Sequence, residues 1–290
     1  MKENQKKIDT HCHSGKNWYE PIESLIFQMD YNNVSKAIII QHGGYFNHEY
    51  LFEASSKYLN RLHIVAQLDP NDENPLETLE KLKSSGACGI RLSPNTKFSK
   101  INSKKIWNTA GELGLPVSVH SDLSGLISEN FQEIISTNSK TKLILEHYAG
   151  LGTTLMGRGK SKELKHKKEL LTGNPFTNAG KIKNHLEHFK KILKYSKHKN
   201  IFVKIHGLGE IESKKKELND SFDLKDSNNI VKLLVENFGS KRLMWGSDFP
   251  PVSGREGYSN SLKSITENKI LSENDLINIF WNSPKKVFNL

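Results

Sequence analysis

Short apolar runs recur along the whole 290-residue chain and alternate with segments of helical periodicity. Runs of about four to eight residues, bounded by Gly, Pro or polar residues, are typical of buried β-strands. Amphipathic stretches between them, such as Glu20–Tyr31, predict helices. We expect eight strands, over Lys7–Cys12, Lys36–His42, His63–Asp69, Cys88–Ser93, Leu115–His120, Lys142–His147, Ile201–His206 and Arg242–Asp248.

This eightfold alternation favours an α/β fold, a closed parallel (β/α)8 TIM barrel, over an open doubly wound sheet. An open sheet of fewer strands is the alternative if one or two strand assignments fail. We find no internal repeat and no Pro/Gly/Ser-rich linker, so residues 1–290 are expected to form a single domain. The longest irregular stretch, Tyr148–Lys183, follows the sixth strand and is expected to be a lid or insertion over the barrel mouth.

The chain is basic, with a net charge of +10 and a pI of about 9.3. Such a charge could attract nucleic acid, anionic membrane or an acidic substrate. Because the charge is mostly lysine and its runs lack interleaved aromatic residues, we expect solvated surface rather than a nucleic-acid interface. A small-molecule substrate is therefore the expected partner, and the sequence leaves a homo-oligomer open.

Location follows from what the sequence lacks. No window approaches the roughly 18 consecutive apolar residues of a membrane-spanning helix, and the first seven residues carry no apolar signal segment. Only two cysteines are present, Cys12 and Cys88, which fits a reducing compartment. We therefore expect a cytoplasmic protein.

Two histidines, His11 and His13, end the first predicted strand. Residues two apart on a strand point to the same face, so both imidazoles could hold one metal ion. Histidine is the commonest metal ligand and suits Zn²⁺. Cys12 points the opposite way and is interpreted as a small buried residue rather than a ligand or nucleophile.

Half of the twelve histidines fall at the ends of predicted strands, where barrel enzymes place their active sites. These are His11, His13, His42, His120, His147 and His206. Asp248 ends the eighth strand, and with these imidazoles it makes a set of nitrogen and oxygen donors suited to catalytic zinc. Histidines in helical or loop segments, such as His48, are expected at the surface.

Several segments carry a family resemblance and follow the family's order along nearly the whole chain. The chain resembles the amidohydrolase superfamily. Within it, the resemblance is to the amidohydrolase-related group of sugar-lactone and dicarboxylate-lactone hydrolases and aminocarboxymuconate-semialdehyde decarboxylase-like enzymes. The matching segments are Ile8–His13, Gly89–Leu92, Leu115–His120, Glu146–Gly150, Val203–Gly207 and Trp245–Pro250.

The resemblance implies a ligand set for one divalent metal ion, with zinc as the expected ion: His11, His13, His120 and Asp248. It also implies that His147 lies beside the metal-bound water rather than on the metal. Binuclear relatives place a bridging lysine or glutamate at the end of the fourth strand. This chain has Arg91 there, so at most one ion is expected.

The chemistry of such a site is hydrolytic. Zinc lowers the pKa of bound water, and Asp248 could take a proton from that water and later deliver it to the leaving group. His147 could donate to the developing oxyanion or orient the water. Arg91 could clamp a substrate carboxylate, or it could form a structural ion pair inside the barrel.

Four further residues are candidates for substrate binding. Lys204 and His206 share a face of the seventh strand. The family often has serine after this lysine, so His206 is a departure, interpreted as a substrate contact or as a hydrogen-bonding support for a ligand. His42, followed by Gly43-Gly44-Tyr45, is interpreted in the same two ways, and Tyr148 could form a wall of the pocket or belong to ordinary packing.

Three functions compete. The leading prediction is a metal-dependent hydrolase of a small, anionic lactone, ester or amide. The second is a metal-dependent non-oxidative decarboxylase, in which Arg91 and the metal hold a carboxylated substrate. The third is a non-enzymatic barrel that binds a polyanion through lysines, which salt-sensitive nucleic-acid binding would favour.

Overall fold

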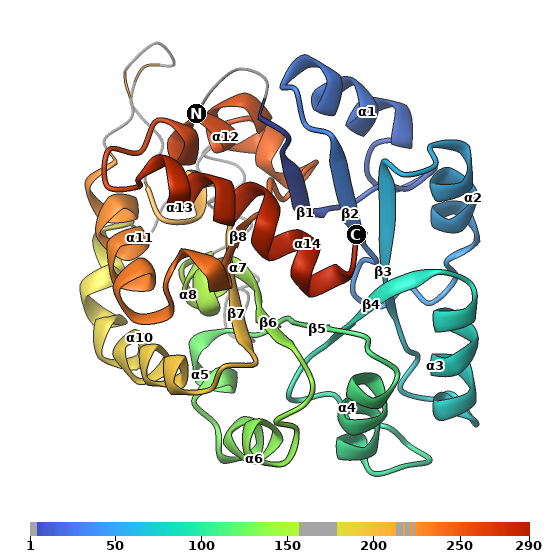
Figure 1. The fold of residues 1–290 in the computed structure, drawn as a ribbon. Coiled ribbons are helices and arrows are strands. Elements are labelled where there is room, and N and C mark those ends of the chain that lie inside the picture. Colours follow the sequence, from blue (N-terminus) through green and yellow to red (C-terminus); the bar gives the residue numbers. More distant parts are fainter. Residues whose placement is uncertain (1–4, 157–178, 213–216, 218–220, 222–223) are drawn as a thin grey trace.

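The computed structural model describes residues 5–156, 179–212, 217, 221 and 224–290. Eight parallel strands form one sheet in the order β1 to β8 (Figure 1). The strands are β1 (Ile8–Cys12), β2 (Lys36–Ile40), β3 (Leu62–Gln67), β4 (Ala87–Leu92), β5 (Val117–Val119), β6 (Leu143–Leu145), β7 (Ile201–Ile205) and β8 (Leu243–Trp245).

The ring closes just beyond the end of β8. The Asp248 amide donates to the His11 carbonyl at 2.8 Å, and the His13 amide donates to the Phe249 carbonyl at 2.7 Å. The predicted single-domain (β/α)8 barrel is therefore confirmed, and every predicted strand is present with slightly different ends.

Helices surround the strands (Figure 1). The apolar periodicity of Gly125–Thr137 predicts one helix, but the structure has two helices in this region, because the Ser128 hydroxyl accepts the Phe131 amide and caps a new helix start there. The helices are α1 (Ile22–Tyr31), α2 (Glu49–Lys57), α3 (Pro75–Ser84), α4 (Ser103–Glu112), α5 (Leu123–Leu126), α6 (Glu129–Thr137), α7 (Glu146–Ala149), α8 (Leu151–Leu155), α10 (Leu186–Leu193), α11 (Lys225–Phe238), α12 (Tyr258–Thr266), α13 (Glu273–Ile277) and α14 (Ser283–Phe288).

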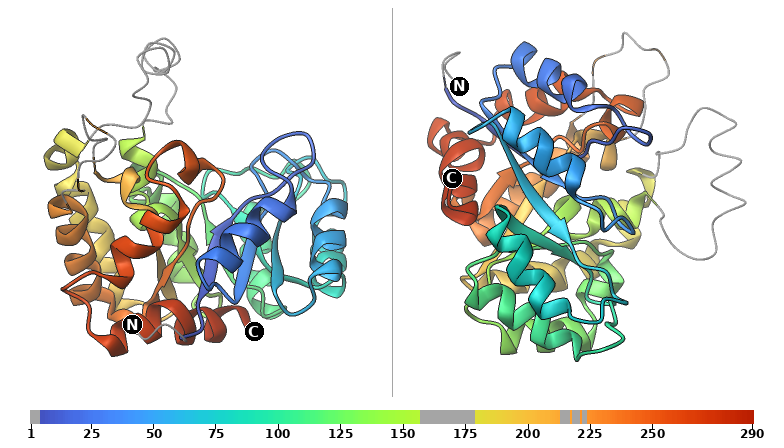
Figure 2. Two further views of the ribbon diagram at one scale, coloured as in Figure 1. Left: turned by 90° about the horizontal axis from the view of Figure 1, so that it is seen from above. Right: turned by 90° about the vertical axis from the view of Figure 1, so that its right-hand side faces the viewer.

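The strands separate two apolar layers. On β2, Ala37 and Ile39 belong to the larger layer under the helices, whereas Ile38 and Ile40 belong to a smaller one inside the barrel. Val287 and Phe288 of α14 join the inner layer. In Figure 2, α14 lies at the end of the barrel where the chain begins. It therefore closes the end that carries the strand starts and leaves the opposite mouth for a site.

A β-bulge in β1 sets the direction in which the side chains of His11 and His13 point. Asp9 pairs with Ala37, but the next partners are Cys12 and Ile39, so β1 has one extra residue here. Ile8 before the bulge lies in the inner layer, while Cys12 after it lies in the outer one. The bulge thus shifts which residues face inward and turns His11 and His13 towards the barrel interior. Cys12 is buried and faces away from them, as expected.

The predicted lid over Tyr148–Lys183 falls largely outside the described residues. Its described ends form α7, α8 and a 3₁₀ turn over Ala179–Asn184. Two of the lysine runs, at 160–168 and 214–216, also lie outside the described residues, while Lys190 and Lys191 are exposed on α10. In the part of the chain that the structure describes, none of the helices combines the length and apolarity needed to cross a membrane.

The expectation that His48 lies at the surface is wrong. Its side chain precedes α2, and the residue is only 8% exposed. The ring Nε2 accepts the backbone amide of Gln67 at 2.9 Å, so the ring has to be neutral at this nitrogen. Burial lowers the pKa of His48 to about 4. The periodicity of α2 gave no hint, because the residue lies one position before the helix.

His48 should make the fold acid-sensitive. The unfolded chain binds a proton here with a pKa of about 6.5, and the folded chain with a pKa of about 4. The unfolded chain therefore takes up a proton at His48 before the folded chain does. The free energy of unfolding is unaffected by His48 above pH 6.5 and falls as the pH is lowered from 6.5 towards 4. Acidification from about pH 7 to pH 5 should lower the free energy of unfolding of the wild type. We expect this decrease to be about 1–2 kcal/mol smaller in His48→Gln.

Urea unfolding at the two pH values measures this effect. His188→Gln, on the exposed side of α10, is the matched control and should leave the difference unchanged. A His48→Gln protein that loses as much stability on acidification as the wild type would show that His48 does not carry the effect.

Candidate functional site

The histidine pair on β1 faces the carboxylate that follows β8. His11 Nε2 lies 3.8 Å from Asp248 Oδ1, and His13 Nε2 lies 3.7 Å from the same oxygen. Asp248 takes a φ of 60°, a left-handed conformation that costs energy for a residue with a side chain. The barrel closure at His11 and Phe249 holds this turn in place.

Two imidazoles have their Nδ1 atoms occupied by acceptors. His13 Nδ1 lies 2.7 Å from the Ile40 carbonyl, and His147 Nδ1 lies 2.8 Å from Glu210. His120 Nδ1 lies between Glu146 Oε2, an acceptor at 3.2 Å, and Arg91 Nη2, a donor at 3.1 Å. An acceptor at Nδ1 fixes the proton there and directs the lone pair of Nε2 into the site. This is the arrangement that metal-binding or base-acting histidines need.

The structure also brings together a compact group that was not predicted as a ligand set. His11, His147, His206 and Asp248 each offer a ligand atom, and these atoms all lie within 4.8 Å of one another. The His206 ring lies 4.4 Å from that of His11 and 4.1 Å from that of His147. Of the predicted ligands, His11 and Asp248 belong to this group, whereas His13 and His120 do not. Burial lowers the pKa of His206 to about 3, which keeps it neutral.

Arg91 forms the structural ion pair that the sequence had left as one alternative. Its Nη2 donates to Glu146 Oε2 at 2.7 Å, and its Nε lies 3.1 Å from Oε1. The Ser118 hydroxyl also donates to Glu146, which is wholly buried. Burial opposes ionisation of Glu146, but the Arg91 guanidinium outweighs it and holds the pKa of Glu146 well below the usual value.

Lys204 and Tyr148, both predicted to bind substrate, lie behind the site. Lys204 is wholly buried, with Nζ 3.0 Å from the Ser118 hydroxyl and 3.3 Å from His11 Nδ1. Burial lowers its pKa to about 8. The Tyr148 hydroxyl donates to the His206 carbonyl at 2.8 Å. Both side chains support the histidines, and neither lines the cavity at the mouth.

A cavity of about 210 Å³ opens at the barrel mouth. The sequence-predicted residues that line it supply one carboxylate, one guanidinium and four imidazoles, so a small anionic molecule could be bound on several sides. The lining is made by His13, Tyr19, His42, Gly43, Arg91, His120, His147, Asp248 and Pro251.

Sequence reasoning missed three charged residues around the histidines. Glu146 precedes His147 directly, and a charged residue ending an apolar run was a usable signal. Glu210 follows β7 and accepts from His147. Arg255 donates to Asp248 Oδ2 at 3.0 Å, but its place in a Gly- and Pro-rich loop gave no signal. Burial opposes ionisation of Asp248, while His13 and Arg255 hold its pKa well below the usual value.

A family model described as Amidohydrolase matches residues 8–290. The chain belongs to the amidohydrolase family. The comparison with curated proteins gives no match. The strand-end histidines and the final aspartate that suggested this family all lie within the residues that the family model matches.

Solved structures share the fold at low sequence identity. A protein from Acinetobacter baumannii, described as a probable 2-pyrone-4,6-dicarboxylic acid hydrolase with citric acid bound, is 17% identical, with a TM-score of 0.72 over 98% of this chain and 99% of that one. A zinc-bound amidohydrolase from Burkholderia multivorans is 14% identical, with a TM-score of 0.71 over 98% and 99%. The 2,6-dihydroxybenzoate decarboxylase from Rhizobium is 13% identical, with a TM-score of 0.62 over 98% and 99%.

Proposed function

We propose that this amidohydrolase is a metal-dependent hydrolase that opens a small anionic lactone, ester or amide. The observation that carries the proposal is the position of Asp248 Oδ1, which lies within 3.8 Å of the Nε2 atoms of both His11 and His13. Asp248 and His13 line the cavity together with Arg91 and His120, so an anionic substrate would lie against the same carboxylate.

The donor set fits a divalent ion. His11 Nε2 is buried and has no hydrogen-bond partner among the described residues. An unpartnered buried polar atom costs free energy, and a cation bound to this nitrogen would remove that cost. His11 Nε2 and His13 Nε2 lie 3.8 and 3.7 Å from Asp248 Oδ1, close enough for these three atoms to share one ion. When bound, the ion would lower the pKa of water and polarise a carbonyl group. Zinc is our choice, because nitrogen and oxygen donors suit it and a structural neighbour binds it.

We propose His11, His13, His120 and Asp248 as the ligands. Three of these line the cavity, so an ion held by them would be within reach of a substrate. The compact group containing His147 and His206 is the competing ligand set. His206 is wholly buried and is not among the cavity-lining residues, so an ion held there would lie deeper. Metal content separates the two sets: His120→Ala should lose the ion, and His206→Ala should keep it.

The remaining residues would move a proton and orient the substrate. Asp248 would accept a proton from the attacking water and return it to the leaving group. Glu210 holds the proton of His147 on Nδ1, so Nε2 would accept a hydrogen bond from the attacking water and orient it. Arg91 uses Nε and Nη2 on Glu146, and its Nη1 would be the atom that contacts a substrate carboxylate.

The substrate class follows from charge and size. The cavity of about 210 Å³ suits a small molecule, and its guanidinium and imidazoles suit negative charge. The A. baumannii neighbour carries citric acid, a polycarboxylate, and is described as a dicarboxylic acid hydrolase. We therefore favour a dicarboxylate lactone over a neutral ester.

A second candidate function is non-oxidative decarboxylation on the same scaffold. It is favoured by the similarity to 2,6-dihydroxybenzoate decarboxylase, whose chain is matched over 99% of its length. The same Arg91 and His120 would then hold a carboxylate next to the carbon that receives a proton.

Product analysis separates the two. With 2-pyrone-4,6-dicarboxylate as the probe, we expect ring opening by net addition of water and no release of CO₂. CO₂ release from 2,6-dihydroxybenzoate, without hydrolysis of any lactone in a panel of dicarboxylate and sugar lactones, would favour the lyase instead.

A further inference from the structure

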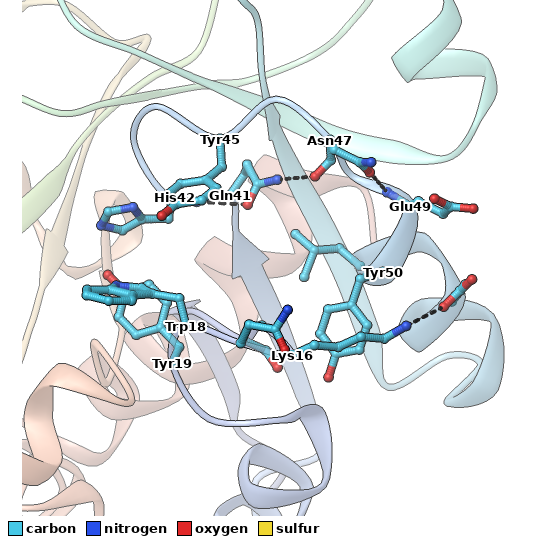
Figure 3. A pocket seen from close by; sticks show the side chains of 14 residues that line it. Lys16, Trp18, Tyr19, Gln41, His42, Tyr45, Asn47, Glu49 and Tyr50 are labelled. Atoms are coloured by element: carbon cyan, nitrogen blue, oxygen red, sulfur yellow. Dashed lines mark hydrogen bonds and ion pairs between the residues drawn. The ribbon is translucent and has the colours of Figure 1, made fainter.

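A second, larger cavity of about 370 Å³ lies outside the first. It is lined by the loop that follows β1, the loop that follows β2, and the start of α2 (Figure 3). Tyr19 and His42 line both cavities, so the two spaces share a wall. Figure 3 shows Trp18 and Tyr19 on one side of the outer cavity and His42 and Tyr45 on the other.

A row of aromatic rings connects the inner site with the outer cavity. Tyr19 stacks on His13 with ring centroids 5.4 Å apart and planes 14° apart. His42 follows at 5.1 Å from Tyr19, and Tyr45 at 5.6 Å from His42. All three separations fall within the range of about 4.5–7 Å in which aromatic rings attract one another. The row therefore runs from a proposed metal ligand to the molecular surface.

The loop that carries Trp18 and Tyr19 has a strained backbone. Tyr19 has a φ of 70°, a left-handed conformation. The loop around it is closed because the Gly15 amide and the Ser14 hydroxyl both donate to the Glu20 carbonyl, at 3.1 and 2.9 Å. A Cβ on Gly15 would lie 2.4 Å from the Trp18 carbonyl oxygen, so only glycine permits this close approach. The strain indicates that the position of the rings matters.

The outer cavity also exposes large apolar surface. Trp18 is 66% exposed and Tyr45 is 52% exposed, which is costly unless a ligand covers them. Some of the polar groups nearby are already bonded within the chain. The Gln41 amide donates to the Asn47 carbonyl, and the Asn47 side chain accepts the Glu49 amide. Lys16 lies 3.9 Å from Glu53 and 5.4 Å from the centre of the Tyr50 ring.

We propose that the outer cavity is a second subsite that takes an uncharged planar aromatic ring of the substrate. This rests on the proposed function and narrows its substrate class to molecules that join an anionic reacting end to an aromatic ring. The anionic end would occupy the inner cavity, and the ring would lie against Trp18 and Tyr45.

Equilibrium binding to the purified full-length protein tests the subsite without requiring turnover. The probes are 2-naphthoate and its saturated analogue decahydro-2-naphthoate, measured by isothermal titration calorimetry. Both carry one carboxylate on the same carbon skeleton, but only naphthoate is planar. We expect naphthoate to bind more tightly, and Trp18→Ala or Tyr45→Ala to weaken it by about 2- to 10-fold, the size of one lost ring contact.

Tyr31→Ala is the matched control, because Tyr31 is 72% exposed and stacks on Phe27 of the same helix, away from both cavities. It should leave both affinities unchanged. Equal affinity for the two probes, no detectable naphthoate binding, or an unchanged naphthoate affinity in Trp18→Ala would overturn the subsite. A protein that prefers naphthoate through Trp18 but hydrolyses no lactone would support the subsite and contradict the proposed function, so the two failures are distinguishable.

Discussion

Replacing Asp248 with asparagine is expected to lower turnover about 10²–10⁴-fold, the effect of losing a general base, while most of the metal stays bound. Asparagine keeps an oxygen in the place of Oδ1, next to His11 and His13, so it still offers the ion a ligand atom. It cannot accept the proton of the attacking water. Steady-state kinetics on a lactone substrate and metal analysis of the same preparation measure the two effects separately.

Asp248 also pairs with Arg255, so the variant needs a check of its fold. Thermal unfolding followed by circular dichroism supplies it. Asp30→Asn is a matched control, because Asp30 forms an ion pair with Arg61 at the surface and is remote from the cavity. It should keep full turnover. An Asp248→Asn protein that is folded, loaded with metal and fully active would exclude Asp248 as the base.

Replacing Glu146 with glutamine is expected to lower the free energy of unfolding by about 3–5 kcal/mol, as when one partner of a buried ion pair is removed. Arg91 would then be a buried cation without an anion beside it. The charge of Lys204 also favours an ionised Glu146, so a second buried cation loses a favourable neighbour. Urea unfolding at neutral pH measures the change.

The control for Glu146→Gln is a solvent-exposed ion pair with a similar distance between its charged atoms. Lys81 and Glu77 are 2.7 Å apart on α3, but both side chains are mostly exposed. Glu77→Gln should change the free energy of unfolding by less than about 0.5 kcal/mol. If the two glutamine variants were equally stable, Glu146 would not have the structural role that its contacts indicate.

Much of the barrel was predictable because its strands are buried on both faces and read as continuous apolar runs. The i, i+2 spacing of His11 and His13 on β1 also predicts their common direction. The ends of the predicted strands placed His120, His147 and Asp248 at one end of the barrel, and the structure brings them to the same cavity.

The residues that the sequence did not reveal act through contacts made only in the folded chain. Arg255 reaches Asp248 from a loop without regular periodicity. His206 lies beside His11 in the compact group because closure of the ring leaves only β8 between β7 and β1, although the two histidines are far apart along the chain. The bulge at Asp9 is equally invisible, since the run Ile8–Cys12 reads as an uninterrupted strand.

The most direct test of a metal-dependent hydrolase is the metal content of the protein purified without chelator, measured alongside its lactone hydrolysis. We predict about one divalent ion per wild-type chain, and loss of both ion and activity in His11→Ala. Chelation should abolish activity, and added zinc should restore it. A wild-type protein that hydrolyses the lactone at full rate with less than roughly a tenth of an ion per chain would contradict the account.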